Sequence, residues 1–582
     1  MNAGLIFISI LHAASAIIFL RVIAIDIIIY ICAALFALLT YLSYKEFIKP
    51  KVWELEKVGS ESEIKDNKTI ESSEAISSSK DDKKEEGLRN RKPIVDNKEG
   101  FKVIYESDKK MRIEERTAKP LLTTCPIFKS EENLTFARLG HVGPNSAKVF
   151  FRIPPHALNL TMDEEFDYSI LKNEKIIIKH SEIQFKGQGA YKNQLTWINE
   201  YEHDFPSQND DYTGYHELTS LKPSSLYYTE ISIKSMPNTI ADIELKTAPA
   251  TDSPTKLTFG TGSCIKPNFP YFPGSAPHIS GFRQMAKHSL DFIMFLGDFI
   301  YADCPFYYGS SLEEYRRLYR QVYTVDDTKN LVSKTPMYHI YDDHEIVDNW
   351  DKTQNPPYGN AIKAYWEYNG SPNPVTDINN NAFYYNFTYG NIAFYVFDTR
   401  GHRDSEEKPD SPEKTMLGAK QKAHFMNWLK ETNHTAAVKF VVSSVPLAYV
   451  WNSGDAKKDT WRGYKYERAS ILSETKYVPN LFFLSGDRHE VAVVRLASDN
   501  YEFSNSPINQ FSLPLVNDHI DGWGGDITEY YQQPGQTKYG VLSVDTKTNE
   551  DIPKVTYSLY TNVDHGAEKP AYVFEAECVE WK

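Results

Sequence analysis

The sequence predicts an α/β core whose β-sheets are flanked by helices, preceded by a small β-sandwich and by N-terminal transmembrane helices. Three observations lead to this fold class. The first 45 residues are almost continuously apolar, strand-like segments alternate between about 125 and 248, and apolar strands separated by helical spacing begin near 254. We therefore expect a membrane anchor over 1–45, a charged, Ser-rich linker over 46–115, the sandwich over 116–250 and the core over 251–582.

The N-terminal segment, residues 4–43, is long enough for two closely spaced helices, each near the roughly 17–25 residues that span a bilayer. A cleaved signal peptide is the alternative, but its apolar region is shorter, about 7–15 residues. Lysines between 45 and 57 favour a cytoplasmic flank. N-x-S/T sequons farther along favour a lumenal or extracellular domain. We expect a membrane location, at the cell surface or in an endomembrane, with the facing open.

The overall charge and the cysteine content exclude two classes of protein. A net charge of −14 argues against a nucleic-acid-binding surface, which needs clustered Lys and Arg. Five widely separated cysteines do not make a disulfide scaffold. If the domain is lumenal, the candidate disulfides are Cys125 with Cys578, Cys304 with Cys125, or Cys304 with Cys578. The sequence leaves the oligomeric state open.

The predicted sandwich consists of alternating strands separated by turn residues, over 147–154, 166–173, 174–185, 215–221 and 226–235. The stretch "HELTSLKPSSLYYTEISI" resembles the corner of a fibronectin-like sandwich. In such a corner a tyrosine, here Tyr227 or Tyr228, closes onto the turn that contains Leu221 and Pro223. We expect a structural role or a substrate gate for this domain.

The predicted core contains six strands, each running into a polar or acidic loop, over 256–264, 291–298, 337–343, 392–400, 438–446 and 480–489. Residues 311–323 and 419–431 show the apolar spacing of helices. Strands that alternate with helices indicate an α/β core, in which ligands bind at the carboxyl ends of the strands.

Three acidic segments follow predicted buried strands and carry the candidate chemistry: "DFIMFLGDFIYAD", "MYHIYDDHEIVDNW" and "LFFLSGDRHEVAV". Clustered carboxylates repel one another unless positive charge lies between them, so we expect a pair of metal ions. The candidate residues are Asp298, Tyr301, Asp342, Asp343, His344, Asn349, Asp487 and His489.

Strand alternation makes further predictions about these side chains. Within a regular strand only one of Asp342 and Asp343 can face the metals, and the sequence leaves open which. Asp487 and His489, two residues apart, would share a face if the strand is still extended there. His344 is a candidate to orient an anionic substrate or to protonate a leaving oxygen, and Arg400 to grip the oxygens of such a substrate.

The ordered set "GTGSC", "GDFIYAD", "MYHIYDDHEIVDNW", "FDTR" and "LSGDRHE" resembles alkaline phosphatase D, a branch of the calcineurin-like metallophosphatases, over roughly 125–580. The resemblance implies that Cys264 as thiolate and Tyr301 as phenolate bind ferric iron, and that calcium is also bound. Asn349 supplies an amide oxygen suited to calcium, although Asp348 beside it is an alternative ligand. Zinc and manganese also fit the residue types.

The expected function is metal-dependent hydrolysis of phosphate monoesters or diesters by a metal-activated hydroxide. A phospholipid-directed phosphodiesterase, resembling phospholipase D in outcome, is one alternative, and the membrane anchor favours it modestly. A catalytically inactive, membrane-tethered binding protein is another, but the expected ligand positions are all occupied. The expected partners are a phosphate-ester substrate and, through the N-terminal helices, a membrane.

Overall fold

The computed structural model describes residues 132–158, 168–183, 195–267, 277–304, 310–376, 378–452, 454–510, 522–548, 552–562 and 569–581. They all belong to one compact unit, Glu99–Lys582. The predicted anchor over 1–45 and linker over 46–115 lie outside the described residues. Among the described helices, none combines the length and the apolar character needed to cross a bilayer.

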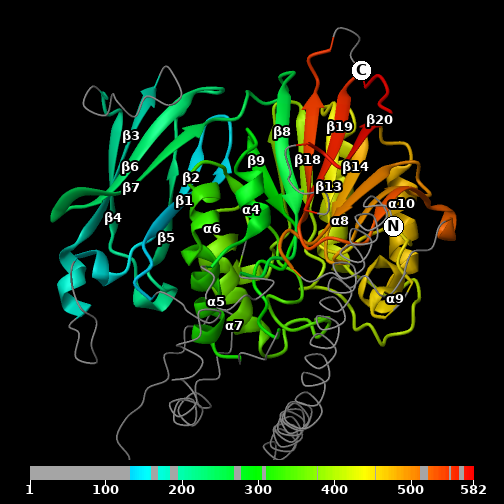
Figure 1. Ribbon diagram of the computed structural model, residues 1–582, viewed down its shortest axis with the longest axis horizontal. Coiled ribbons are helices and arrows are strands. Elements are labelled where there is room, and N and C mark those ends of the chain that lie inside the picture. Colours follow the sequence, from blue (N-terminus) through cyan, green and yellow to red (C-terminus); the bar gives the residue numbers. More distant parts are fainter. Residues whose placement is uncertain are drawn as a thin grey trace, which may run out of the picture. The chain divides into compact units, whose positions relative to one another are not determined.

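Two antiparallel sheets form the predicted sandwich (Figure 1). One has the order β1 (Phe136–Val142), β2 (Ala147–Arg152), β5 (Thr213–Leu218), and the other the order β4 (Asn199–Asp204), β3 (Lys175–Ile183), β6 (Leu226–Ile233), β7 (Met236–Lys246). Alternate residues of both sheets, such as Val149 and Ile178, are buried between them. The expected corner forms through Tyr227, whose hydroxyl accepts a hydrogen bond from the Lys222 amide at 2.9 Å.

One predicted strand of this domain is wrong. Tyr168–Asn173 is a 3₁₀ helix that ends just before β3. The segment has Ser169, Lys172 and Asn173 among its apolar residues, so its alternation is weak. Short 3₁₀ helices also cover Pro155–Leu158 and Gln208–Asp210.

The core contains two mixed sheets. The first has the order β10 (Met337–His339), β9 (Phe292–Phe295), β8 (Lys256–Gly262), β18 (Lys538–Asp545), β19 (Lys554–Thr561), β20 (Tyr572–Ala576). The second has the order β11 (Tyr385–Tyr389), β12 (Ile392–Val396), β13 (Val438–Val442), β14 (Leu481–Ser485), β16 (Tyr501–Asn505), β15 (Val491–Arg495), β17 (Ile527–Gln532). The six strands predicted for the core fall in the parallel parts of these sheets.

The two core sheets pack face to face through aromatic side chains. Phe259 of β8 contacts Phe394 of β12 and Phe440 of β13, with ring centroids 5.5 and 5.3 Å apart. Residues of opposite parity on β12, such as Tyr395, point instead into a second core. Because both faces of the central strands are buried, their sequences are predominantly apolar.

Helices cover the outer faces of the sheets (Figure 1). Side chains of α4 (Ser280–Met285), α5 (Leu312–Thr324), α6 (Asp326–Val332) and α7 (Tyr358–Tyr365) belong to the first core. Those of α8 (Gly418–Thr432) and α10 (Lys465–Thr475) belong to the second, and the short α9 (Ala456–Asp459) lies between these two in sequence. Single turns cover Trp366–Gly370, Ile378–Asn380, Trp461–Gly463 and Trp523–Gly525.

The predicted helix over 311–323 matches α5, and its sequence carries its own start signal. The Ser311 hydroxyl accepts from the Glu314 amide, while the Glu314 carboxylate accepts from the Ser311 amide. This capping box stabilises a helix start by about 1 kcal/mol.

Buried polar groups join the sandwich to the core. Asp211, in the loop before β5, accepts hydrogen bonds from Arg152 of the sandwich, from Arg320 of α5 at 2.6 Å and from the Tyr368 hydroxyl. Arg138 of β1 donates to the Tyr368 carbonyl at 2.8 Å. Removing one member of such a network would leave a buried charge unpaired, which costs about 3–5 kcal/mol.

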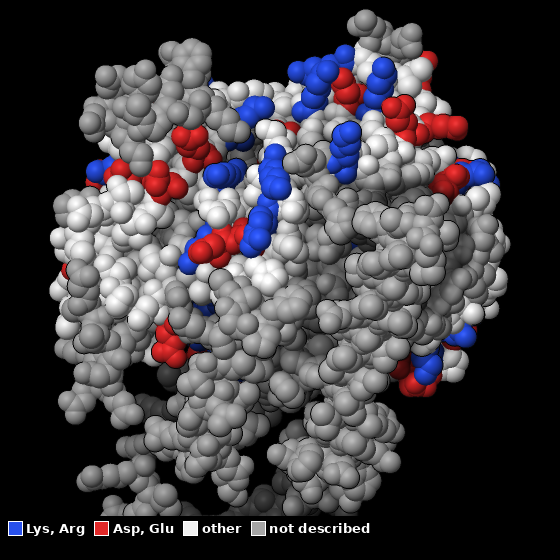
Figure 2. Space-filling model, in the orientation of Figure 1, with Lys and Arg blue, Asp and Glu red and all other residues white. Residues whose placement is uncertain are grey.

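Three of the five cysteines are described, and Cys264, Cys304 and Cys578 are all free thiols. The suggested pair of Cys304 with Cys578 therefore does not form, whereas the pairs with Cys125 lie outside the described residues. On the face shown in Figure 2, Lys and Arg side chains lie beside Asp and Glu side chains. Some of these opposite charges form ion pairs between neighbouring strands, as Lys256 does with Asp545.

Candidate metal centre

The acidic segments meet at the carboxyl ends of strands from both core sheets. Cys264 follows β8, Asp298 and Tyr301 follow β9, and Asp342 follows β10, all in the first sheet, whereas Asp487 follows β14 of the second. The side chains thus converge from two sheets. In a doubly wound fold they would instead all come from the edge of a single sheet.

Four carboxylates form the centre of the site: Asp298, Asp342, Asp343 and Asp487 offer oxygens that lie within 4.8 Å of one another. Asp298 Oδ1, Asp342 Oδ2 and Asp343 Oδ1 are buried and make no hydrogen bond to any described residue. Burial and the neighbouring carboxylates raise the pKa of Asp298 well above its usual value, against the opposing effect of His344. The arrangement fits cations, because a cation would satisfy these oxygens and remove the repulsion.

A mixed set of donors adjoins this cluster on one side. Tyr301 Oη lies 3.2 Å from Asp298 Oδ2 and 3.0 Å from His489 Nε2. Cys264 Sγ is 3.2 Å from the same Asp298 oxygen, and Cys264, Asp298 and His489 form a candidate metal group. Burial and the Asp298 carboxylate raise the pKa of both the Cys264 thiol and the Tyr301 phenol. These donors need a cation to become thiolate and phenolate.

The backbone is strained at the candidate ligands. Five of them adopt φ between 55° and 70°, a region that L-residues rarely occupy: Cys264, Asp298, Asn349, Asp487 and His489. Each such residue costs on the order of 1–3 kcal/mol, and such residues cluster at functional sites. The ligands therefore lie in turns beyond the strand ends.

This turn geometry corrects both arguments from strand alternation. Strand β10 ends at His339, so Asp342 and Asp343 both reach the cluster. Strand β14 ends at Ser485, so Asp487 and His489 do not share a face of an extended strand. They reach the site because left-handed residues turn the chain.

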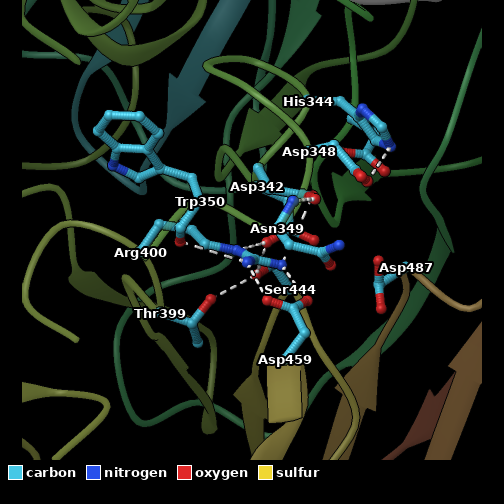
Figure 3. A network of polar contacts seen from close by, with 12 residues as sticks. Asp342, His344, Asp348, Asn349, Trp350, Thr399, Arg400, Ser444, Asp459 and Asp487 are labelled. Atoms are coloured by element: carbon cyan, nitrogen blue, oxygen red, sulfur yellow. Dashed lines mark hydrogen bonds and ion pairs between the residues drawn. The ribbon is translucent and has the colours of Figure 1, made fainter. Parts of the chain in front are cut away.

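The expectation that Arg400 grips phosphate is corrected. Its side chain is 0% exposed, and its Nε donates to Asp342 Oδ1 while its two terminal nitrogens donate to Asp459. Figure 3 shows this guanidinium enclosed between Asp342 and Asp459. With its donors used in this way, Arg400 orients Asp342 so that Oδ2 is left for a cation.

Sequence reasoning missed Asp459, at the end of α9. Its carboxylate accepts from Arg400 and from Arg403, and these two arginines hold its pKa far below the usual range despite burial. Nothing in the local sequence "AKKDTWRG" indicates the contact, because the partners lie more than fifty residues away.

Glu345, which follows His344 in "MYHIYDDHEIVDNW", is a supporting residue that is absent from the predicted site. Its Oε2 accepts from the amides of Asp298 at 3.0 Å and Asp342 at 2.8 Å, and its Oε1 accepts from the Phe299 amide at 2.6 Å. One fully buried side chain thus holds two ligand-bearing loops together.

His344 lies at the outer side of the cluster, as expected. Its ring packs on Tyr301 with centroids 4.2 Å apart, and its Nδ1 contacts Asp303 Oδ1 at 2.7 Å. Burial lowers the pKa of His344, but the surrounding carboxylates, Asp303 foremost, outweigh burial and raise it well above the usual value. Asp303 was not predicted, although it ends the motif "GDFIYAD".

Asn349 and Asp348 have different surroundings. The Asp348 carboxylate lies 3.8 Å from His344 Nε2 and forms a group with Asp303 and His344. The backbone N–H of Asn349 donates to Asp343 Oδ2. Figure 3 shows the Asn349 side chain near Asp342, with Asp348 beside His344. Of the two alternatives, Asn349 is the one adjacent to the carboxylate cluster.

Comparisons with known proteins identify relatives of the chain and of its fold. Residues 259–541 match the family model described as PhoD-like phosphatase. The chain is 26% identical over 352 residues to alkaline phosphatase D of Bacillus subtilis (strain 168), covering 53% of this chain and 58% of that protein. It thus spans somewhat more than half the length of this curated relative.

Two solved structures share the fold. A structure described as that of PhoD has a TM-score of 0.56 and 18% identity, covering 76% of this chain and 92% of that one. The purple acid phosphatase PPD1 of yellow lupin (Lupinus luteus) has a TM-score of 0.50 and 11% identity, covering 76% and 74%. The chain therefore shares its α/β fold with these two phosphatases. Residues 259–541 form a PhoD-like phosphatase domain.

Proposed function

We propose that this protein hydrolyses phosphate esters with the help of cations held by the carboxylate cluster. The observation that carries the proposal is the group of buried carboxylates with three oxygens that accept no hydrogen bond, beside the thiol of Cys264 and the phenol of Tyr301. Domain membership and the curated relative, whose printed name is alkaline phosphatase D, support the same reaction class.

The donor chemistry suggests two different cations. The resemblance to alkaline phosphatase D implies ferric iron on the side of the thiol, phenol and imidazole donors, where the ligands would be Cys264, Asp298, Tyr301 and His489. Oxygen donors alone, from Asp298, Asp342, Asp343, Asp487 and Asn349, suit calcium. Bound cations would supply Lewis-acid chemistry, polarising the phosphate and making water a better nucleophile near neutral pH.

The protein's own side chains position and protonate the substrate in this proposal. His344 is only partly buried, and Asp303 contacts its Nδ1, so its Nε2 is the atom available to donate a proton to the leaving oxygen. No serine or cysteine nucleophile is needed. Phosphate monoesters and diesters both fit, and the predicted anchor keeps lipid-linked esters among the candidates.

The test combines metal analysis of the purified full-length chain with hydrolysis of p-nitrophenyl phosphate and bis-p-nitrophenyl phosphate. Asp298→Asn and His489→Ala should each reduce turnover at least about 100-fold and lower the bound metal. Asp499→Asn is the matched control, because Asp499 is an exposed aspartate that also has a positive φ, 66° against 59° for Asp298. Undiminished turnover of both substrates in the two site variants would refute the proposal.

A further inference from the structure

A pair of histidines joins the two sheets of the sandwich, in a part of the protein that the proposed reaction does not use. His203 lies on β4 and His216 on β5, and these are the edge strands of the four-stranded and three-stranded sheets. His203 Nε2 and His216 Nδ1 are 2.6 Å apart, with ring centroids separated by 4.5 Å. The contact thus bridges two sheets that share no backbone hydrogen bonds.

Both imidazoles are neutral at neutral pH. Burial, and then His203 and His180, lower the pKa of His216 to about 4. Burial also lowers the pKa of His203, although Asp204 opposes it. A neutral imidazole carries one nitrogen lone pair, which makes it the commonest metal ligand in proteins.

The surroundings of the pair are aromatic and incompletely hydrogen bonded. The Tyr201 ring lies between two histidines, with centroids 4.3 Å from His216 and 5.9 Å from the buried His180. His180 Nδ1 and His216 Nε2 are buried without a hydrogen bond to any described residue. The hydrogen bond between His203 and His216 therefore leaves two nitrogens of the histidine cluster, His180 Nδ1 and His216 Nε2, unsatisfied among the described residues.

We propose that His203 Nε2 and His216 Nδ1 bind a transition-metal ion of the zinc, nickel or copper type, which clamps the two sheets of the sandwich together. Ligand bonds of about 2.0–2.1 Å in tetrahedral geometry separate two nitrogens by about 3.3 Å, so small ring rotations suffice. Both side chains are partly exposed, so an ion can reach them from solvent. With an ion bound, each ring carries its proton on the nitrogen that faces away from the ion, so the ring that donates the present hydrogen bond must change tautomer.

Imidazole donors distinguish this site from the carboxylate cluster. Nitrogen ligands select zinc, nickel and copper over calcium, whereas the cluster offers oxygens to hard cations. The two sites share no residue, so loss of one leaves the ligands of the other in place.

Equilibrium dialysis of the full-length, metal-loaded protein against micromolar Zn²⁺ tests the proposal. The unmodified protein should bind one equivalent more than the double variant His203→Gln/His216→Gln. His156→Gln is the matched control, since His156 is an exposed histidine of the same domain, and it should retain the extra equivalent. Equal stoichiometry in the unmodified protein and the double variant would overturn the proposal.

Cu²⁺ titration followed by electron paramagnetic resonance adds a readout of ligand type. Coupling to two nitrogens should appear in the unmodified protein and be lost in each single variant, His203→Gln and His216→Gln. Each single variant keeps one imidazole, so the single variants test the proposal even if the double variant does not fold. Retention of the two-nitrogen signal in both single variants would contradict the assignment, whatever their phosphatase activity.

Discussion

Arg400 and Asp342 form a buried ion pair in which the guanidinium Nε donates to one carboxylate oxygen and leaves the other without a hydrogen bond. The free oxygen, Asp342 Oδ2, belongs to the carboxylate cluster, and the far end of Arg400 is held by Asp459. Arg400 is thus a positioning residue: its bidentate contact with Asp459 fixes the guanidinium, and its Nε then orients Asp342.

Arg400→Lys should lower kcat and the amount of bound metal, with little change in KM. A lysine cannot contact Asp342 and Asp459 together, so Asp342 loses its fixed orientation, and the free energy of unfolding should fall by about 3–5 kcal/mol. Steady-state kinetics, metal analysis and denaturant unfolding measure these effects. A raised KM with unchanged metal content and stability would instead show that Arg400 contacts the substrate phosphate.

Glu345→Gln should weaken cation binding although Glu345 does not itself lie among the candidate ligands. The amide group of a glutamine would bring N–H donors toward the amides of Asp298, Phe299 and Asp342, so the two loops would separate. We expect a 10–100-fold loss of metal affinity, measured by titration with a metal indicator. Glu407→Gln, at an exposed surface pair with Lys458, should leave the affinity unchanged.

Glu502 should make stability depend on pH. Burial raises the pKa of Glu502 from 4.5 to about 7, although the Ser485 hydroxyl and the amides of Leu447 and Ala448 donate to it. The folded protein therefore binds this proton more tightly than the unfolded chain, and the stabilisation present below pH 4.5 is lost as pH rises through about 7.

The effect of Glu502 is on the order of 3 kcal/mol between these limits. Thermal unfolding of the unmodified protein and of Glu502→Gln between pH 4.5 and 8 would measure it as a difference. The destabilisation of the unmodified protein on raising the pH should be larger than that of the variant. Parallel pH profiles would show that Glu502 does not titrate in this range.

Tyr227→Phe should destabilise the sandwich by about 1 kcal/mol, because its hydroxyl satisfies the Lys222 amide in the corner. Tyr228→Phe is the natural comparison, because the Tyr228 hydroxyl donates to the Asp242 carboxylate on strand β7. Denaturant unfolding of both variants would compare the two tyrosines. If Tyr228→Phe lowered the free energy of unfolding more than Tyr227→Phe, the assignment of the corner to Tyr227 would be wrong.

Much of the fold could be predicted because its information is local. Continuous apolar runs such as 392–396 and 481–484 marked strands buried on both faces, and the spacing over 311–323 marked α5. The predicted strand over 166–173 is wrong in its described part, Tyr168–Asn173, because Ser169, Lys172 and Asn173 weaken the apolar alternation.

The sequence by itself determined the kinds of side chain at the site and their order along the chain, since these are properties of the motifs. Only the tertiary structure decided that Asp342 and Asp343 both enter the cluster, that Arg400 is buried, and that Asp459 and Glu345 support the ligands. These outcomes depend on left-handed turns beyond the strand ends and on contacts between segments far apart in sequence. The same holds for His203 and His216, whose meeting across two sheets follows from packing and not from any local pattern.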